Sequence, residues 1–268
     1  MMFQIPNVLR ARNYRLYLSD GKRLVDLWLN GGAAVLGHTP KNQLRELKNT
    51  ASRGLYAPFP HFTEERFYKA LFKLFPQFNF RIYAAPPAEL VATFSHRDTK
   101  TTKDTENIRA IKFWRPFLNP AFPFAPENAP LFIPILPGIQ TWRDGLPYGL
   151  FVLAAKSENV FDKLPPSDIL PPVLLAAATR GIYDLIAAPE RAKPSKFIVK
   201  AIQESKWQRK GIYLTLKDQI APEEWAELFN KFFDSGFLLP PSQAFPLILP
   251  GEMSKGEEAK LAAMLQGI

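Results

Sequence analysis

The chain has 268 residues, 47% of them hydrophobic, so it can form one large domain or two modest ones, and global disorder is not expected. It has no cysteine, which excludes disulfides, thiolate metal sites and a cysteine nucleophile. The net charge is +9, but Lys and Arg occur in ones and twos without a nucleic-acid-reading motif, so we expect a solvated basic surface and no nucleic-acid partner.

The segment "MMFQIPNVLRARNYR" lacks the apolar core of a signal peptide. No stretch approaches the roughly 18 uninterrupted apolar residues of a membrane-spanning helix. We therefore expect a cytoplasmic protein without a membrane partner.

In the N-terminal part, alternating apolar residues on either side of Asp20-Gly21 predict a β-hairpin over 14–28. Thr39 and Pro40 are expected to start a helix that runs to about Ser52. The pattern then predicts a helix over 64–75 capped by Thr63, a buried strand, proline turn and helix within 78–90, and a strand over 108–114.

The segment from Pro116 to Pro137 contains seven prolines, a density that argues against a long helix or a central strand. We interpret it as an ordered surface crossing anchored by its Phe residues. The alternative is a proline-rich ligand for an aromatic groove.

In the C-terminal part, Ser254 and Glu257 form an S-x-x-E capping box ahead of the last helix. The other expected elements are a buried strand (149–155), a helix (171–188), a strand (209–218), an amphipathic helix (222–236) and a short strand (245–250). Strands alternate with helices, which predicts an α/β or α+β class with helices covering a sheet.

The order of these segments resembles the class III (ornithine and glutamate-semialdehyde type) aminotransferases of the fold-type I PLP enzymes. The similarity rests on "DGKRLVDLWLNGGAAVLGHTPKNQLREL", on "TEERFYKALFKLFP" and on the segment from "GIYLTLK" to the end, about two thirds of the chain. It implies a shortened large domain with a mixed or parallel sheet, and a small α+β domain.

The resemblance also implies a domain division. Residues 1–60 would form an N-terminal hairpin and helix packing with the small domain, 61–188 a trimmed large domain, and 189–268 the small domain. Because the family builds its sites at a dimer interface, it implies a homodimer or a pairing with a complete related subunit.

The cofactor lysine of the family is not matched. "IQTWRDGLPYGLFVLAA" is similar to the turn that follows this lysine, and Pro147 and Gly149 fit, but Gln140 stands at the lysine position. An amide cannot form the imine that holds pyridoxal phosphate (PLP). The nearest downstream lysine, Lys156, lies beyond the matching strand.

The phosphate cradle is altered as well. Where the family has Ser-Gly-Ser/Thr-Glu-Ala, this chain has "PPAEL": Glu89 matches, but Pro86, Pro87 and Ala88 replace the cradle. Proline has no N–H to offer a phosphate. The plain interpretation of "AAPPAEL" is a strand-to-helix turn.

Other family positions are also changed. The interval from Glu89 to Gln140 is much shorter than in the family and lacks the acid for the pyridine nitrogen. Ser167 matches a phosphate-contacting threonine but is more typical of a helix cap, and Leu247 stands where the family often has a substrate-binding Arg. His38, His61 and His96 have no ligand spacing, so no metal is expected.

These observations support three hypotheses. The first is a catalytically degenerate aminotransferase-like protein with a binding or assembly role and no cofactor. The second is a working PLP enzyme with an aberrant site or with a lysine donated by a partner; its cofactor-binding remnants would be Ala88, Glu89, Gln140 and Ser167. The third is a small-ligand or anion-binding protein.

Overall fold

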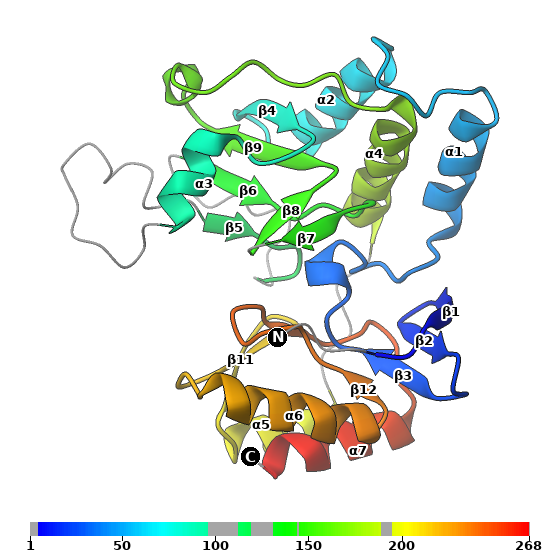
Figure 1. The fold of residues 1–268 in the computed structure, drawn as a ribbon, viewed down its shortest axis with the longest axis vertical. Helices are drawn as coiled ribbons and strands as arrows, with labels where there is room; N and C mark the ends of the chain where they lie inside the picture. Colours follow the sequence, from blue (N-terminus) through cyan, green and yellow to red (C-terminus); the bar gives the residue numbers. More distant parts are fainter. Residues whose placement is uncertain (1–4, 96–111, 119–130, 144, 189–194, 268) are drawn as a thin grey trace. The chain divides into compact units, whose positions relative to one another are not determined.

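The computed structural model describes residues 5–95, 112–118, 131–143, 145–188 and 195–267. The chain forms two compact units (Figure 1). Unit 1 comprises Met1–Pro40, Phe117–Pro120 and Ala188–Ile268, and unit 2 comprises Lys41–Pro116 and Ala121–Ala187.

Unit 2 is built on a mixed four-stranded sheet in the order β4-β9-β6-β5. The strands are β4 (Asn79–Tyr83), β9 (Phe151–Ala155), β6 (Leu131–Pro134) and β5 (Lys112–Trp114). β9 is antiparallel to both of its neighbours, whereas β5 and β6 are parallel. A separate hairpin joins β7 (Thr141–Arg143) to β8 (Leu146–Tyr148).

Both faces of this sheet are buried, which is why β6 and β9 read as continuous apolar runs. On one face Ile133, Leu153 and Leu90 of α3 (Ala88–Ser95) belong to a single apolar cluster. On the other face Phe132 packs edge-on against Phe75, with ring centroids 5.3 Å apart. In Figure 1, α3 and α4 (Pro172–Ala187) lie on opposite sides of the strands.

The remaining helices of unit 2 pack on α4. Both α1 (Lys41–Ala51) and α2 (Thr63–Leu74) contact it along their length. Pro172 occupies the first position of α4, as the sequence predicts.

Unit 1 contains two small sheets. The first has the order β1-β2-β3-β12 and consists of β1 (Val8–Arg12), β2 (Arg15–Leu18), β3 (Arg23–Asp26) and β12 (Phe237–Leu238). The second consists of β10 (Trp207–Lys210), β11 (Tyr213–Leu216) and β13 (Leu247–Ile248). β12 pairs parallel to β3, so the C-terminal segment completes a sheet that the N-terminal hairpin begins.

Three helices complete unit 1: α5 (Lys196–Gln203), α6 (Pro222–Asp234) and α7 (Lys255–Gln266). A 3-10 turn, η1 (Asn30–Gly32), follows β3. The predicted hairpin at Asp20-Gly21 is confirmed, with Leu16 opposite Leu24. The predicted capping box of Ser254 and Glu257 is present at the start of α7.

The prediction that no central strand forms in the proline-rich segment is wrong. β6 lies between β9 and β5, and Pro134 is its last residue. The strand tolerates this proline because its pairing with β9 involves only Leu131 and Phe132, so no partner on that side requires the missing N–H. Residues 119–130, the rest of the crossing, lie outside the described residues.

Three local predictions are corrected. Thr63 does not cap α2 but is its first residue, because its hydroxyl lies 3.1 Å from His61 Nδ1 instead. The expected single strand over 209–218 is the β10–β11 hairpin, which turns at Gly211 with φ of 60°. No element was predicted over 196–203, where α5 forms and buries Ile198, Ala201 and Ile202.

The boundary expected at residue 60 differs from the division in the structure, where α1 is part of unit 2. The physical reason is its packing on α4, supported by a 3.1 Å hydrogen bond from Asn42 Nδ2 to Asp184 Oδ1. His96 and the first part of the strand predicted over 108–114 lie outside the described residues.

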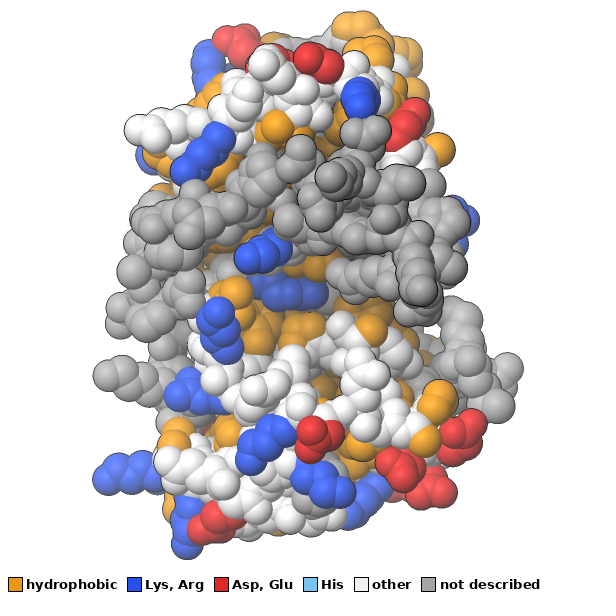
Figure 2. All heavy atoms as spheres, turned by 90° about the vertical axis from the view of Figure 1, so that its left-hand side faces the viewer, with side chains coloured by type: hydrophobic (Ala, Val, Ile, Leu, Met, Phe, Trp, Pro, Cys, Tyr) orange, Lys and Arg blue, Asp and Glu red, His pale blue; other side chains and the backbone are white. Residues whose placement is uncertain are grey.

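Charged side chains of opposite sign are intermingled in the lower half of the face that Figure 2 shows. Exposed ion pairs one helical turn apart occur in both units: Glu65 with Lys69 in α2, and Lys200 of α5 with Glu204, the residue that caps its C-terminus. None of the helices in the described part of the chain has the length and apolar character needed to cross a membrane.

Candidate functional site

The residues that the resemblance singles out lie in unit 2, around the end of β4. β4 ends at Tyr83, and α3 begins at Ala88 after a turn that contains Pro86 and Pro87. Ala88 and Glu89 are exposed, whereas both prolines are buried. The matched glutamate is therefore at the surface of the helix start.

The backbone of Ala84 connects this turn to two other segments. Its N–H donates to Asp168 Oδ2 over 2.8 Å, and its carbonyl accepts from the N–H of Gly149 over 2.7 Å. We call Ala84 and these two partners the Ala84 junction. The junction brings the segments that contain Ser167 and Gln140 to the same end of β4.

Gln140, which the resemblance aligns with the family's lysine, is 6% exposed. Its Nε2 donates a 2.8 Å hydrogen bond to the carbonyl of Leu150, the residue that follows Gly149 of the junction. This bond fixes the amide against the backbone just before β9. The lone pair of an amide nitrogen is delocalised into its own carbonyl group, so Gln140 cannot attack an aldehyde as a lysine amine does.

Lys156 does not replace the missing amine. Leu150 precedes β9 and Lys156 follows it, so the two residues lie at opposite ends of a five-residue strand, about 17 Å long. The Lys156 ammonium lies 6.0 Å from the centre of the Phe78 ring, beyond the far end of the strand. The structure thus separates the nearest downstream lysine from Gln140.

The start of α3 has few N–H groups to offer an anion. Pro86 and Pro87 have none, and the N–H groups of Leu90 and Val91 both donate to the Pro87 carbonyl, over 3.0 and 3.1 Å. A phosphate cradle requires several backbone N–H groups directed outward. In this turn the N–H groups of Leu90 and Val91 are instead satisfied by the Pro87 carbonyl.

Ser167 lies against the edge of β4, and not at the start of α4 as a helix cap would. Its Oγ accepts from the N–H of Ile82 over 3.1 Å and lies 3.1 Å from the Tyr68 hydroxyl. Burial raises the pKa of Tyr68, so this phenol stays protonated and can hydrogen-bond to Ser167. The expectation of a cap is wrong, because α4 begins only at Pro172.

The segment around Ser167 is attached to β4 by further bonds. The N–H of Asp168 donates to the Ile82 carbonyl over 2.9 Å, and the Tyr83 hydroxyl donates to the Pro165 carbonyl over 2.8 Å. Burial raises the pKa of Tyr83 to about 12. These contacts complete the hydrogen bonding of an edge strand, a structural use of the polar groups.

The other positions considered from the sequence lie apart from this turn. Leu247 is in β13 of unit 1 and is 1% exposed. His38 Nε2 lies 2.9 Å from Asp26 Oδ2, a pair within unit 1. Within the described ranges, no three His, Asp or Glu side chains are close enough together to hold a metal ion.

Sequence comparison finds relatives but no matching family model. A protein of Treponema pallidum (strain Nichols) is 25% identical, over 91% of this chain and 88% of the relative. A protein of Borreliella burgdorferi is 26% identical, over 94% and 87%. Both are described only as uncharacterized proteins.

Structure comparison identifies the fold. Ornithine aminotransferase from Plasmodium yoelii matches with a TM-score of 0.68 and 11% identity, over 99% of this chain and 94% of that chain. An omega-transaminase from Sphaerobacter thermophilus matches with 0.66 and 13%, over 98% and 90%. A serine palmitoyltransferase from S. paucimobilis with a bound PLP–myriocin aldimine matches with 0.66 and 8%, over 99% and 93%. The chain has the mixed α/β fold of PLP-dependent aminotransferases.

The residues around the Ala84 junction do not fit covalently bound PLP. The position that the resemblance assigns to the imine lysine holds a buried amide, the turn before α3 contains two prolines, and Lys156 lies at the other end of β9 from Leu150, the partner of Gln140. The chain therefore has the fold of the PLP enzymes, but the polar groups at the Ala84 junction hydrogen-bond to one another.

Sequence reasoning missed Tyr68 and Asp168, which contact Ser167 and Ala84. Asp168 could have been noted, since Ser-Asp between proline pairs in "PPSDILPP" favours side-chain bonds to backbone N–H groups. Tyr68 carries no such signal, because its spacing within α2 only marks it as partly buried.

Proposed function

We propose that this chain is a catalytically degenerate relative of the class III aminotransferases. It uses the fold-type I scaffold for binding or assembly and performs no PLP chemistry. The observation that carries the proposal is Gln140, a buried amide bonded to the Leu150 carbonyl at the position of the cofactor lysine. The fold itself does not specify chemistry, so the site decides.

Two further observations support the proposal. Pro86 and Pro87 remove N–H donors from the helix start that would receive a phosphate. Ser167 retains a hydroxyl, but the hydroxyl is engaged by Ile82 and Tyr68. Both features favour a junction stabilised by its own hydrogen bonds over a site whose polar groups are available to a ligand.

The assembly part of the proposal is a homodimer, or a pairing with a complete related subunit. Its support is the resemblance to a family whose sites are shared between subunits. In a pair with a complete related subunit, this chain would supply a scaffold and the related subunit would carry the catalytic lysine.

The test is incubation of the purified chain with PLP, followed by borohydride reduction and peptide mapping by mass spectrometry. We expect no saturable visible absorbance of an imine and only weak labelling spread over exposed lysines. Lys156→Arg is the control: the weak labelling of the other lysines should be the same in this variant as in the wild-type chain.

One stoichiometric PLP adduct on a single lysine of this chain, formed with a saturable visible band, would overturn the proposal. A Lys156 adduct that disappears in Lys156→Arg would do so most directly.

A further inference from the structure

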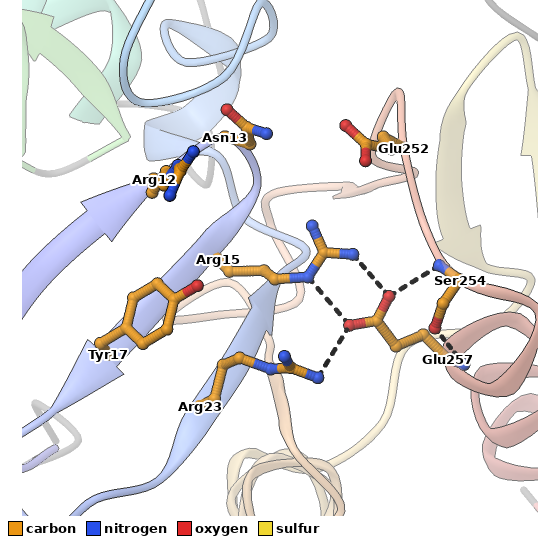
Figure 3. A pocket seen from close by; sticks show the side chains of 8 residues that line it. All are labelled: Arg12, Asn13, Arg15, Tyr17, Arg23, Glu252, Ser254 and Glu257. Atoms are coloured by element: carbon orange, nitrogen blue, oxygen red, sulfur yellow. Dashed lines mark hydrogen bonds and ion pairs between the residues drawn. The ribbon is translucent and has the colours of Figure 1, made fainter.

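A pocket of about 310 Å³ lies entirely within unit 1, apart from the residues on which the proposed function rests. It is formed by the β1–β2 hairpin, by β3 and by the segment that leads into α7 (Figure 3). The charged residues of its lining are Arg12, Arg15, Arg23, Glu252 and Glu257. Its volume suits a small metabolite.

The floor of the pocket is a fixed ion pair. Arg15 donates to both carboxylate oxygens of Glu257, through Nε over 2.9 Å and Nη2 over 2.6 Å. The N–H of Ser254 donates to the same carboxylate over 2.8 Å. The two side chains are only 15% and 14% exposed, so the pair is preformed and nearly neutral.

The walls carry charges that this pair does not satisfy. Arg12 and Glu252 are both exposed, and neither has an ion-pair partner in the part of the chain that the structure describes. Figure 3 shows them on opposite sides of the pocket, with the Asn13 amide near Arg12. The third nitrogen of the Arg15 guanidinium makes neither bond to Glu257 and points into the space between them.

Arg23 adds a further positive charge at the lower edge of the pocket. Its Nη2 lies 3.6 Å from Glu257 Oε1, longer than the bonds from Arg15, and its side chain is 58% exposed. The lining as a whole has three arginines and two glutamates, a small positive excess with both signs present.

This arrangement disfavours ligands of a single charge type. A simple anion near Arg12 and Arg15 would be repelled by Glu252, and a simple cation near Glu252 would be repelled by the arginines. A molecule with both charges can satisfy both walls, and its opposite charges would match two groups that otherwise face only water.

We propose that this pocket binds a small zwitterion, with a carboxylate or phosphate on the Arg12 and Arg15 side and an ammonium at Glu252. A carboxylate and a phosphate are equivalent in this proposal, because a guanidinium group binds either one through two parallel N–H donors. Asn13 contributes a neutral amide to the anionic end.

The test is isothermal titration calorimetry of the full chain. The probes are L-alanine and phosphoethanolamine as zwitterions, acetate and inorganic phosphate as anions, and ethylamine as a cation. We expect the wild-type chain to bind at least one zwitterion at least about tenfold more tightly than the single-charge probes. The tighter of the two zwitterions identifies the anionic group.

Two variants give a reciprocal signature. Arg12→Gln and Glu252→Gln should each weaken zwitterion binding by about tenfold, and Glu252→Gln should also strengthen phosphate binding because the repulsion is removed. Glu223→Gln, an exposed residue of α6 outside the pocket, is the matched control and should change neither. All three side chains are exposed, so circular dichroism should show an unchanged fold.

Absence of zwitterion binding, or binding of acetate or phosphate to the wild-type chain as tightly as the zwitterions, would refute the proposal. Equal affinities in the wild-type chain and the Arg12→Gln and Glu252→Gln variants would also refute it. None of these results bears on the PLP experiment, which tests unit 2.

Discussion

Asp26 shows how a single buried carboxylate organises the segment after β3. It is 2% exposed, and its Oδ1 accepts from the N–H groups of Trp28 and Leu29 over 2.8 and 3.0 Å. Its Oδ2 lies 2.9 Å from His38 Nε2. Asp26 and His38, both in the segment that resembles the family's entry motif, thus stabilise the local backbone.

We predict that Asp26→Ala lowers the free energy of unfolding by about 3 kcal/mol, because two backbone donors and an imidazole lose their buried acceptor. Asp26→Asn should cost less, since its amide oxygen can still accept from Trp28 and Leu29. Urea denaturation monitored by tryptophan fluorescence measures both.

The control for Asp26 is Asp234→Ala: the Asp234 side chain is 75% exposed and pairs with Lys22 at 3.3 Å. It should change stability by less than about 1 kcal/mol. Equal effects of Asp26→Ala and Asp234→Ala would contradict the role assigned to Asp26.

Glu257 predicts a pH dependence of stability. The hydrogen bond from Arg15 is the main cause that lowers the pKa of Glu257 from 4.5 to about 2. Because the folded state favours the ionised form, this stabilisation is complete above pH 4.5 and is lost as the pH falls towards 2.

We expect Glu257→Gln to lose about 1 kcal/mol above pH 4.5, a value reduced for solvent screening, and to differ less from the wild-type chain near pH 2. Urea denaturation across this pH range measures the difference. A gap between the two proteins that does not narrow on acidification would show that the carboxylate is not the titrating group.

At the scale of elements, α4 illustrates packing that overrides helix propensity. Gly181 lies within this helix, where Ala is ordinarily the better residue by about 1 kcal/mol. A Cβ at this position would lie 2.6 Å from the Pro137 carbonyl oxygen and 2.9 Å from Pro137 Cβ. The absence of a side chain therefore permits the close approach of the segment that precedes Gln140.

We predict that Gly181→Ala destabilises the protein by about 1–3 kcal/mol, the cost of overpacking against backbone. Gly256→Ala in α7 is the matched control, because nothing lies within 4 Å of its added Cβ, and it should be neutral or stabilising. Thermal denaturation of both variants decides the point. Stabilisation by Gly181→Ala would mean that Pro137 can move aside.

The proline-rich segment makes a related point. A four-residue strand that ends in Pro134 can form because each neighbour pairs with only part of it. β5 pairs with Phe132, Ile133 and Pro134, and β9 pairs with Leu131 and Phe132. Proline limits the extent of pairing on each side, and does not exclude the strand from the centre of the sheet.

For the whole molecule, the proposed assembly predicts a mass in solution. If the chain forms a homodimer, multi-angle light scattering should give twice the 30.4 kDa of one chain, with a dependence on concentration only at high dilution. A mass of one chain at all concentrations would contradict the homodimer, and would leave pairing with a related subunit as the form of assembly to test by co-purification.

Much of the fold could be predicted from local sequence, because its signals act within a few residues. Asp20-Gly21 fixes the β2–β3 turn, Ser254 and Glu257 fix the start of α7, and the apolar run of β9 marks a strand buried on both faces. The proposed loss of the lysine and of the cradle likewise rests on residue type, because an amide cannot form an imine and proline has no N–H.

Only the tertiary structure decided which distant segments meet. The parallel pairing of β12 with β3, the central place of β6 and the Ala84 junction join residues that are far apart in the chain. No local sequence pattern predicts the contact of Tyr68 with Ser167 or the pocket at the Arg15–Glu257 ion pair. The physical reason is that hydrogen bonds and packing across the fold depend on which surfaces come together, and residue spacing along one element does not specify its partner.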